Sequence, residues 1–422
     1  MQMRKARPVI LVGPLPPPYH GQSVAFEMLV GGCADRGVPN LVVDIAHGER
    51  STSRLGQATW HRAVEYVRIL SHYVRAILQP RTVVYLTIAQ STHGFARDFV
   101  MIWLARLLGH RVVCHLHGGN YRAFYDEQAR WLQVLIRATL RRADSILILG
   151  ERLRDAFGFD PQLRPKLQVV PNGLPVRNFQ LPPPKRLPAR PSPETPVRVL
   201  FLSNLVESKG YLDLLEALRL VRERPFGRAI VALFCGKFMA NPADDCRVRD
   251  AEHGRRLFDE LIERYGLSDQ VSYLGPVTGE AKWSVLRDAH IFVLPTYYNN
   301  EGQPVSIIEA MAFGNVVIST PYRAIPDLVE DGSTGLLVPP RDPASLADAL
   351  SALIEDPERY ARMSARAIRR FAERFTWEAH VDTLLSHLGH QSRSHTRSSR
   401  DRDVPDPIPQ GHRLGHVSRD WT

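Results

Sequence analysis

The stretch that decides the fold is IFVLPTYYNNEGQPVSIIEAMAFGNVVIST, residues 291–320. It begins with an apolar run, 291–296, continues through a loop rich in polar residues, and then changes to a helical pattern that Gly314 ends. A second apolar run, 316–320, follows at once. Both runs are short and uninterrupted, which is typical of parallel strands that helices cover on both faces. Residues 291–320 therefore predict a strand–helix–strand unit.

The same alternation of short apolar runs and helical patterns extends along the chain. The predicted strands are residues 8–13, 41–46, 82–89, 111–118, 145–150 and 167–173 in the first half, and 197–203, 229–236, 271–275, 291–296, 316–320 and 335–339 in the second. A Pro-rich stretch, 181–196, separates the halves, because it can neither continue a helix nor join a central strand. We expect two Rossmann-like α/β domains, residues 1–185 and 195–376. The Ser-, Arg- and Pro-rich residues 391–422 are predicted to be a disordered tail.

The composition of the chain indicates the cellular compartment in which the protein works. The 422 residues are 44% hydrophobic but contain no apolar run of the roughly 18 residues that a membrane span needs. The start, MQMRKARPVILVG, lacks the features of a secretory signal. The 4 cysteines are scattered without a C-x-x-C pair. These features favour a cytoplasmic protein.

Charge is unevenly distributed. Residues 1–180 carry 23 Lys and Arg against 12 Asp and Glu, a net charge of +11, whereas residues 181–390 carry 25 against 28. Such asymmetry indicates an anionic partner of the first half, with an Arg-rich solvated surface as the alternative. A nucleic acid is not expected, because no RRM, KH or zinc-finger pattern occurs.

Polar residues gather where predicted strands end, which is where open parallel sheets bind ligands. Glu301 lies in the loop after strand 291–296, Glu309 lies eight positions later on the following helix, and Lys209 follows strand 197–203. The loop after strand 291–296 and the N-terminus of the following helix would direct free N–H groups and a positive dipole end at a ligand. Proteins hold phosphates and sugar oxygens in this way.

The segment EGQPVSIIEAMAFGNVVI resembles the E-x7-E signature of retaining GT-B glycosyltransferases, most closely family 4. Three further segments resemble the same family: VVPNGLP (169–175), FLSNLVESKGYLDLLEAL (201–218) and VEDGSTGLLVPPRDPASLADAL (329–350). The resemblance covers about residues 8–390. It implies a GT-B fold, with two Rossmann-like domains facing across a cleft. Residues 1–185 would then bind the acceptor, residues 195–376 the donor, and a helix at 377–390 would return to the first domain.

The resemblance also implies an activity. It is the transfer of a glycosyl unit, of hexosyl type, from a UDP-, GDP- or other nucleotide-linked sugar to an acceptor hydroxyl, with the anomeric configuration kept. No metal or other cofactor is expected. A glycan or lipid-linked saccharide would be the acceptor, in cell-surface polysaccharide or lipid-linked glycan assembly.

Site residues follow from the same resemblance. The predicted catalytic residues are Glu301, Lys209 and His117. The predicted donor-binding residues are Glu309, Gly302, Gln303, Pro304, Val305, Asn204 and Gly236. The predicted acceptor-side loop consists of Gly21, Gln22 and Ser23. Asn204 stands where the family usually has an arginine, so the sequence departs from the family pattern at this part of the phosphate clamp.

Each of these residues also has an ordinary structural interpretation. Glu309 would cap a neighbouring loop, Glu301 and Lys209 would be solvated charges, and His117 would be a core histidine. Ser23 would simply cap the next helix.

Two other classes of function remain open on the sequence. A GT-B-like nucleotide-sugar epimerase would use the same cleft, while a phosphorylase would need a pyridoxal lysine that is not recognisable here. A non-catalytic nucleotide-binding module is the third class. Residues 60–79 and 130–142 predict amphipathic helices in the basic half. Two interpretations of these helices remain open: ordinary surface helices packed on the core, or peripheral contact with the anionic inner face of the plasma membrane.

Overall fold

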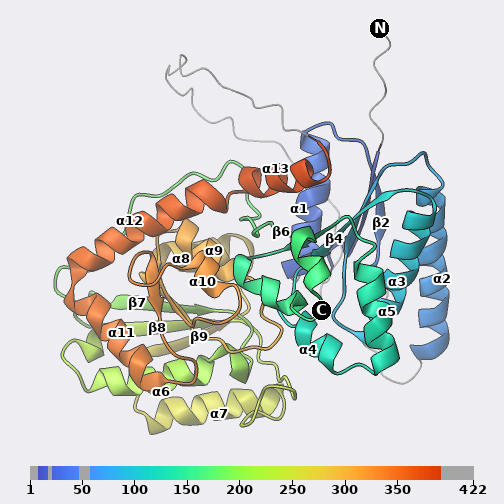
Figure 1. The fold of residues 1–422 in the computed structure, drawn as a ribbon. Coiled ribbons are helices and arrows are strands. Elements are labelled where there is room, and N and C mark those ends of the chain that lie inside the picture. Colours follow the sequence, from blue (N-terminus) through green and yellow to red (C-terminus); the bar gives the residue numbers. More distant parts are fainter. Residues whose placement is uncertain (1–7, 18–20, 47–57, 391–422) are drawn as a thin grey trace, which may run out of the picture. The chain divides into compact units, whose positions relative to one another are not determined.

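The computed structural model describes residues 8–17, 21–46 and 58–390, and the predicted tail 391–422 lies outside the described residues. Two six-stranded sheets form its framework (Figure 1). The strand orders are β2-β1-β3-β4-β5-β6 and β12-β11-β10-β7-β8-β9. All neighbouring strands within both sheets are parallel.

The strands are β1 Val9–Gly13, β2 Asn40–Asp44, β3 Val83–Thr87, β4 Arg111–Leu116, β5 Ser145–Ile148, β6 Leu167–Val169, β7 Val197–Leu202, β8 Ile230–Cys235, β9 Val271–Gly275, β10 Ile291–Leu294, β11 Val316–Ser319 and β12 Gly335–Leu337. The α-helices are α1 Gly21–Asp35, α2 Ala58–Ile77, α3 Thr92–Leu107, α4 Tyr121–Asp126, α5 Arg130–Leu140, α6 Tyr211–Arg222, α7 Ala251–Arg264, α8 Gly279–Asp288, α9 Val305–Ala312, α10 Ile325–Leu328, α11 Pro343–Glu355, α12 Pro357–Arg374 and α13 Trp377–His387. Short 3-10 turns are η2 Glu151–Phe157, η3 Pro161–Lys166, η4 Glu207–Lys209 and η5 Gly227–Ala229.

The first sheet is covered on both faces, and β1 shows how. Its residues alternate between faces because side chains in a strand have a period of two. Ile10 and Val12 pack into a core with helices α2, α3 and α5, whereas Val9 and Leu11 pack into a second core with α1 and α13. Figure 1 shows the same two layers of helices on either side of this sheet. The continuous apolar run in the sequence is therefore explained by burial on both faces.

Every predicted strand overlaps an observed one, so the strand pattern is confirmed. The expectation of burial on both faces is wrong for β2 and β9, two of the four edge strands, where Leu41, Val42 and Leu274 are exposed. These strands have a neighbour on one side only, so helices cover them incompletely. Gly314 ends α9 as predicted, at φ +73°.

Helix α1 corrects one detail of the predicted acceptor-side loop. Gly21, Gln22 and Ser23 lie within α1 rather than in a loop. Ser23 is a buried helical residue, so it is not the N-cap that the sequence suggested.

The last described helix, α13, packs against the first sheet. Val381, Leu384 and Leu385 share a core with Val9 and Leu11 of β1. The chain thus crosses to the first domain after α12. No helix among the described residues is long and apolar enough to cross a bilayer.

Candidate active site

The second sheet reverses its strand order between β10 and β7, which are hydrogen-bonded neighbours. Loops leaving such a pair diverge to opposite faces, and the space between them is the usual ligand site of an open parallel sheet. The loop after β7 carries Lys209, in turn η4, and the loop after β10 carries Glu301. Two predicted catalytic residues, 92 positions apart in the chain, therefore flank one switch point.

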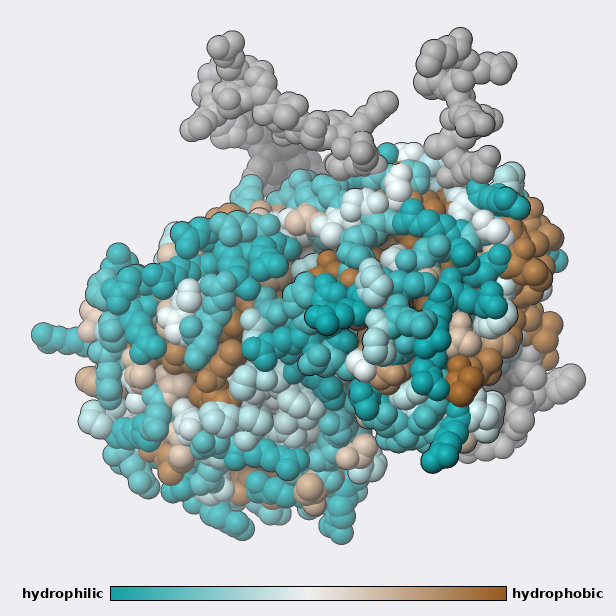
Figure 2. All heavy atoms as spheres, in the orientation of Figure 1, coloured by the Kyte–Doolittle hydropathy of each residue, from teal (hydrophilic) through white to brown (hydrophobic). Residues whose placement is uncertain are grey.

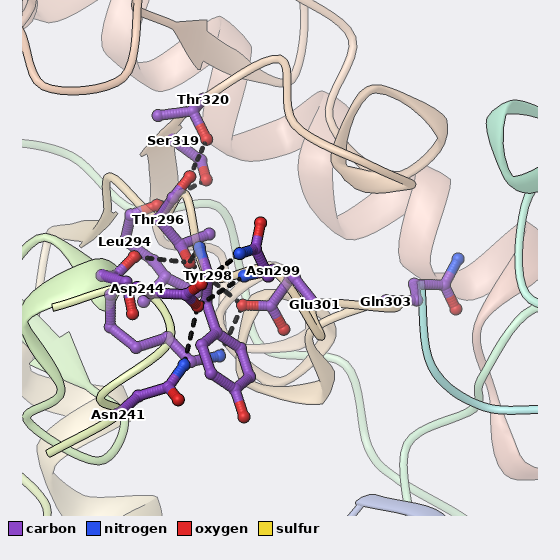
Figure 3. A network of polar contacts seen from close by, with 12 residues as sticks. Asn241, Asp244, Leu294, Thr296, Tyr298, Asn299, Glu301, Gln303, Ser319 and Thr320 are labelled. Atoms are coloured by element: carbon purple, nitrogen blue, oxygen red, sulfur yellow. Dashed lines mark hydrogen bonds and ion pairs between the residues drawn. The ribbon is translucent and has the colours of Figure 1, made fainter. Parts of the chain in front are cut away.

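Lys209 and Glu301 form an ion pair. The Lys209 Nζ atom lies 2.5 Å from Oε2 of Glu301, and the side chains are 14% and 8% exposed. The Thr296 hydroxyl also donates to Oε2, at 3.2 Å. The Oε1 atom of Glu301 makes no hydrogen bond with the described residues, so it is the oxygen that a ligand hydroxyl would meet. Figure 3 shows the Thr296 side chain next to Glu301.

The backbone joins the two loops. The Tyr297 N–H donates to the Ser208 carbonyl at 2.8 Å. Gly210, at φ +81°, passes so close to Pro295 that a Cβ atom would lie 2.4 Å from the Pro295 carbonyl oxygen. Any side chain at this position would push the loops apart, which explains the Lys-Gly pair in the sequence.

Glu309 has a different environment. It lies on α9, is 5% exposed, and accepts a hydrogen bond from Lys282 Nζ of α8 at 2.7 Å. Burial raises the pKa of Glu309, and the Lys282 ammonium group opposes that rise. The Lys282 ammonium also lies 4.4 Å from the centre of the Trp283 ring. Lys282 was not anticipated, because no motif in the sequence marks it.

Gly302 and Gln303 of the Glu301 loop contact the first domain. A Cβ on Gly302 would lie 2.3 Å from the His117 carbonyl oxygen, so the glycine permits a close approach of two backbones. Gln303 is 5% exposed and uses its side-chain amide on the protein itself: Oε1 accepts from Asn172 N at 2.6 Å, and Nε2 donates to the Leu149 carbonyl at 2.9 Å. Pro304 precedes α9, and Val305 is its first residue.

His117 follows β4 of the first sheet and is therefore brought next to Gly302. Its ring centre lies 4.0 Å from that of His115. His115 is fully buried, its Nδ1 lies 2.7 Å from the Tyr85 hydroxyl, and burial holds its pKa well below the usual value. His115 is therefore a neutral, buried residue of the core.

The remaining predicted residues lie at the ends of β8, β7 and β1. Gly236, at φ +146°, follows β8, and a Cβ there would lie 1.9 Å from the Ser203 carbonyl oxygen. The neighbouring Asn204 is exposed after β7. Gly21, Gln22 and Ser23 begin α1 beyond the carboxyl end of β1. Among the described residues, no group of three or more His, Cys, Asp or Glu is arranged to hold a metal ion.

Residues 185–370, which contain the second sheet, match the family model of glycosyl transferases group 1. Solved structures agree over both sheets. A sucrose-phosphate synthase from Thermosynechococcus elongatus has a TM-score of 0.66 at 20% identity, covering 91% of this chain and 98% of that one. The HepE protein of Anabaena, in a complex with UDP and glucose, has a TM-score of 0.63 at 17% identity, covering 90% and 99%. The fold is GT-B.

Curated relatives are glycosyltransferases by name. They include an alpha-D-kanosaminyltransferase of Streptomyces kanamyceticus, 26% identical over 68% of this chain and 73% of the relative. The putative colanic acid biosynthesis glycosyltransferase WcaL of Escherichia coli K12 is 30% identical over 53% and 51%, and a D-inositol 3-phosphate glycosyltransferase of Nocardia farcinica is 31% identical over 56% and 49%. The chain thus spans about half the length of the latter two. Together the comparisons support a GT-B glycosyltransferase.

Within this GT-B fold, sequence reasoning missed the partners of the motif residues. Thr296, Lys282 and Asp244 each bind a predicted site residue or its loop. The polar turn around Asp244, NPADDC, is a recognisable loop signal. Nothing in the sequence, however, indicates which loop it would contact.

Proposed function

We propose that this protein is a glycosyltransferase that moves a sugar from a nucleotide-diphosphate sugar to an acceptor hydroxyl group. The observation that carries the proposal is the buried Lys209–Glu301 pair at the β7–β10 switch point, inside the residues that match the group 1 family. A cation beside a carboxylate with one open oxygen suits a ligand that joins a diphosphate to a sugar. The HepE complex with UDP and glucose and the nucleotide-sugar enzymes among the neighbours add support.

The proposed reaction retains the anomeric configuration, as in family 4. The diphosphate leaves while the acceptor hydroxyl attacks the same face of the sugar, and a leaving phosphate oxygen takes the acceptor proton. Lys209 has three N–H bonds, of which one is directed at Glu301, so the others are free to donate to the diphosphate. Glu301 would hold a sugar hydroxyl, Glu309 the ribose, and His117 the transferred sugar. With Lys209 and loop amides balancing the phosphate charge, we propose that no metal takes part.

We further propose that the acceptor is a glycan or lipid-linked saccharide and that the protein works at the cytoplasmic face of a membrane. The surface of α2 and α5 supports this proposal. Val67 and Trp131 are 68% and 70% exposed, and Figure 2 shows hydrophobic surface on the side where α2 and α3 lie in Figure 1. Four arginines of the same helices make no ion pair among the described residues: Arg68, Arg75, Arg130 and Arg137. A surface that combines apolar side chains with unpaired cations suits an anionic bilayer.

A panel of nucleotide sugars tests the central proposal. The purified protein is heated with each compound, and the true donor raises the melting temperature because it binds only the folded state. That donor is then incubated with and without saccharide acceptors, and the product is examined by NMR. An α-linked donor is expected to yield an α-linked product. A β-linked product refutes retention, and an epimerised nucleotide sugar without transfer replaces the proposal with an epimerase.

Liposome sedimentation tests the membrane proposal separately. The protein is expected to sediment with anionic but not neutral vesicles at low salt, and about 0.5 M NaCl should release it because the screening length is then short. The double reversal Arg130→Glu and Arg137→Glu should weaken sedimentation, whereas Arg255→Glu on α7 of the second domain should not. Equal sedimentation with both vesicle types, or with neither, would exclude electrostatic attachment.

A further inference from the structure

The segment between β8 and α7 binds both loops of the candidate site. We name residues 237–248 the bridging segment. Its first residues pair with the loop after β7: the Leu205 N–H donates to the Lys237 carbonyl at 2.8 Å, and the Met239 N–H donates to the Leu205 carbonyl at 3.1 Å. The bridging segment therefore begins as an extension of the sheet alongside the Lys209 loop.

Two carboxylates attach the bridging segment to the turn that carries Lys209. Oε2 of Glu207, a residue that is 6% exposed, accepts from three consecutive backbone N–H groups of residues 246–248, at 3.0, 2.6 and 2.9 Å. Oδ1 of Asp245 accepts from the Ser208 N–H at 3.2 Å. Hydrogen bonds from several N–H groups to one carboxylate are strong and specify geometry. The position of Lys209 thus depends on the bridging segment.

A third carboxylate attaches the same segment to the loop that carries Glu301. Asp244 is 8% exposed, and its Oδ2 accepts from the Asn299 N–H at 2.9 Å and from Asn241 Nδ2 at 2.7 Å. Its Oδ1 accepts from the side-chain Nδ2 of Asn299. Asn299 lies two residues before Glu301, and Figure 3 shows Asp244 between Asn241 and Asn299.

We propose that Asp244 is a positioning residue of the active site, which sets the place of Glu301 by holding Asn299. Asp244 makes no hydrogen bond with Glu301, whose side-chain partners are Lys209 and Thr296, so it acts through the backbone of the loop rather than on a ligand. Small misplacements of a reacting group reduce rates strongly, by about 100-fold for 1 Å. This inference rests on the proposed glycosyl transfer and adds a determinant of its rate.

An exchange of the two side chains tests the contact. In Asp244→Asn, the new amide nitrogen faces a donor unless the Asn299 amide turns over. That turn would break the hydrogen bond that the Tyr322 hydroxyl donates to Asn299 Oδ1 at 3.2 Å. In Asn299→Asp, two carboxylates face each other and repel. In the double variant, an amide nitrogen at position 244 faces a carboxylate at position 299, and the amide oxygen still accepts the other two N–H groups. The double variant therefore restores every hydrogen bond of the original pair.

Kinetics and hydrogen exchange are the two readouts. Each single variant is expected to lower kcat by about 10-fold or more, with KM for the nucleotide sugar within twofold, because Glu309 and Lys282 do not depend on this contact. The double variant should recover kcat to within about threefold. The rate of amide hydrogen exchange in a peptide covering residues 296–303 should rise in both single variants. It should return to the wild-type rate in the double variant. Asp259→Asn, in an exposed pair with Arg255 on α7, is the matched control and should change neither readout.

Recovery of both readouts in the double variant supports the proposal. Single variants that keep kcat within twofold of wild type overturn it, and so does a double variant that folds but does not recover. A wild-type protein that transfers no sugar refutes the proposed function instead. In that case amide hydrogen exchange alone decides whether Asp244 holds the loop, because hydrogen exchange does not depend on turnover.

Discussion

Breaking the Lys209–Glu301 pair has a predictable cost in stability. The two side chains are 14% and 8% exposed, and their charged atoms lie 2.5 Å apart. Lys209→Met keeps most of the side-chain length but leaves the Glu301 carboxylate buried with only the Thr296 hydroxyl as a side-chain partner. Removing one member of a buried pair costs about 3 to 5 kcal/mol, because the remaining charge has lost its counterion. For a domain of this size, 3 kcal/mol corresponds to a fall in Tm of roughly 6 to 12 °C.

A double variant measures the interaction energy between Lys209 and Glu301 apart from their contacts with other residues. Lys209→Met combined with Glu301→Gln removes both charges, so it should cost less than the sum of the single variants by about 2 to 3 kcal/mol. Thermal unfolding at neutral pH measures all three. Activity provides a second readout, since Lys209→Met should reduce kcat/KM by about 1 to 3 kcal/mol, roughly 5- to 150-fold, through the lost bond to the diphosphate.

An exposed pair on α7 provides the control. Arg255 and Asp259 are 45% and 47% exposed at 2.7 Å, and such pairs contribute little. Asp259→Asn removes this pair and leaves in place the Arg255 guanidinium, which lies 4.6 Å from the centre of the Tyr273 ring. This variant should therefore shift Tm by no more than about 2 °C. If Lys209→Met and Glu301→Gln shift Tm no more than this control, or if their effects simply add, the buried pair does not exist in solution and the reasoning fails.

Glu309→Ala is expected to weaken nucleotide-sugar binding by about 10-fold, the effect of a lost hydrogen bond to a charged group, with kcat much less affected; unchanged affinity by calorimetry would remove Glu309 from the donor site. Stability should also fall in acid through His380, whose pKa burial lowers to about 4 despite the hydrogen bond with the Pro171 carbonyl. The buried Nε2 of His380 has no acceptor among the described residues, so the unfolded chain binds the proton first. This contribution is complete above about pH 6.5 and is lost, by up to about 3 kcal/mol, as the pH falls to 4. His380→Gln should flatten that part of the urea-unfolding profile and the exposed His72→Gln should not; identical profiles would contradict the assignment.

Much of the fold was predictable because its signals are local. A run of buried residues that needs helices on both faces is recognisable within five or six positions, as residues 291–296 and 316–320 illustrate. The exceptions, β2 and β9, lie at sheet edges, and the order of strands cannot be recognised from any one run. The first turn of α1 was mistaken for a loop, since Gly21 is a poor helix former that an exposed N-terminus tolerates.

The candidate site also has features that the sequence predicts and features that it does not. Glu301, Glu309 and Lys209 belong to short motifs, and their positions after β10, on α9 and after β7 follow from the chain around them. The sequence did not show whether Glu301 is solvated or paired, because its partner, Lys209, lies 92 residues away in the chain.

The sequence by itself determined two parallel α/β domains, their Pro-rich connection, and the loops that carry polar residues at strand ends. Only the tertiary structure decided which of those loops meet. The order β10-β7-β8 places the loops of Glu301, Lys209 and Asp244 at successive positions along one sheet edge. Apolar runs specify that a strand is buried but not which strand lies beside it, and that choice depends on packing over the whole sheet. Hence the pairs Lys209–Glu301, Lys282–Glu309 and Asp244–Asn299 became visible only when the strands were assembled.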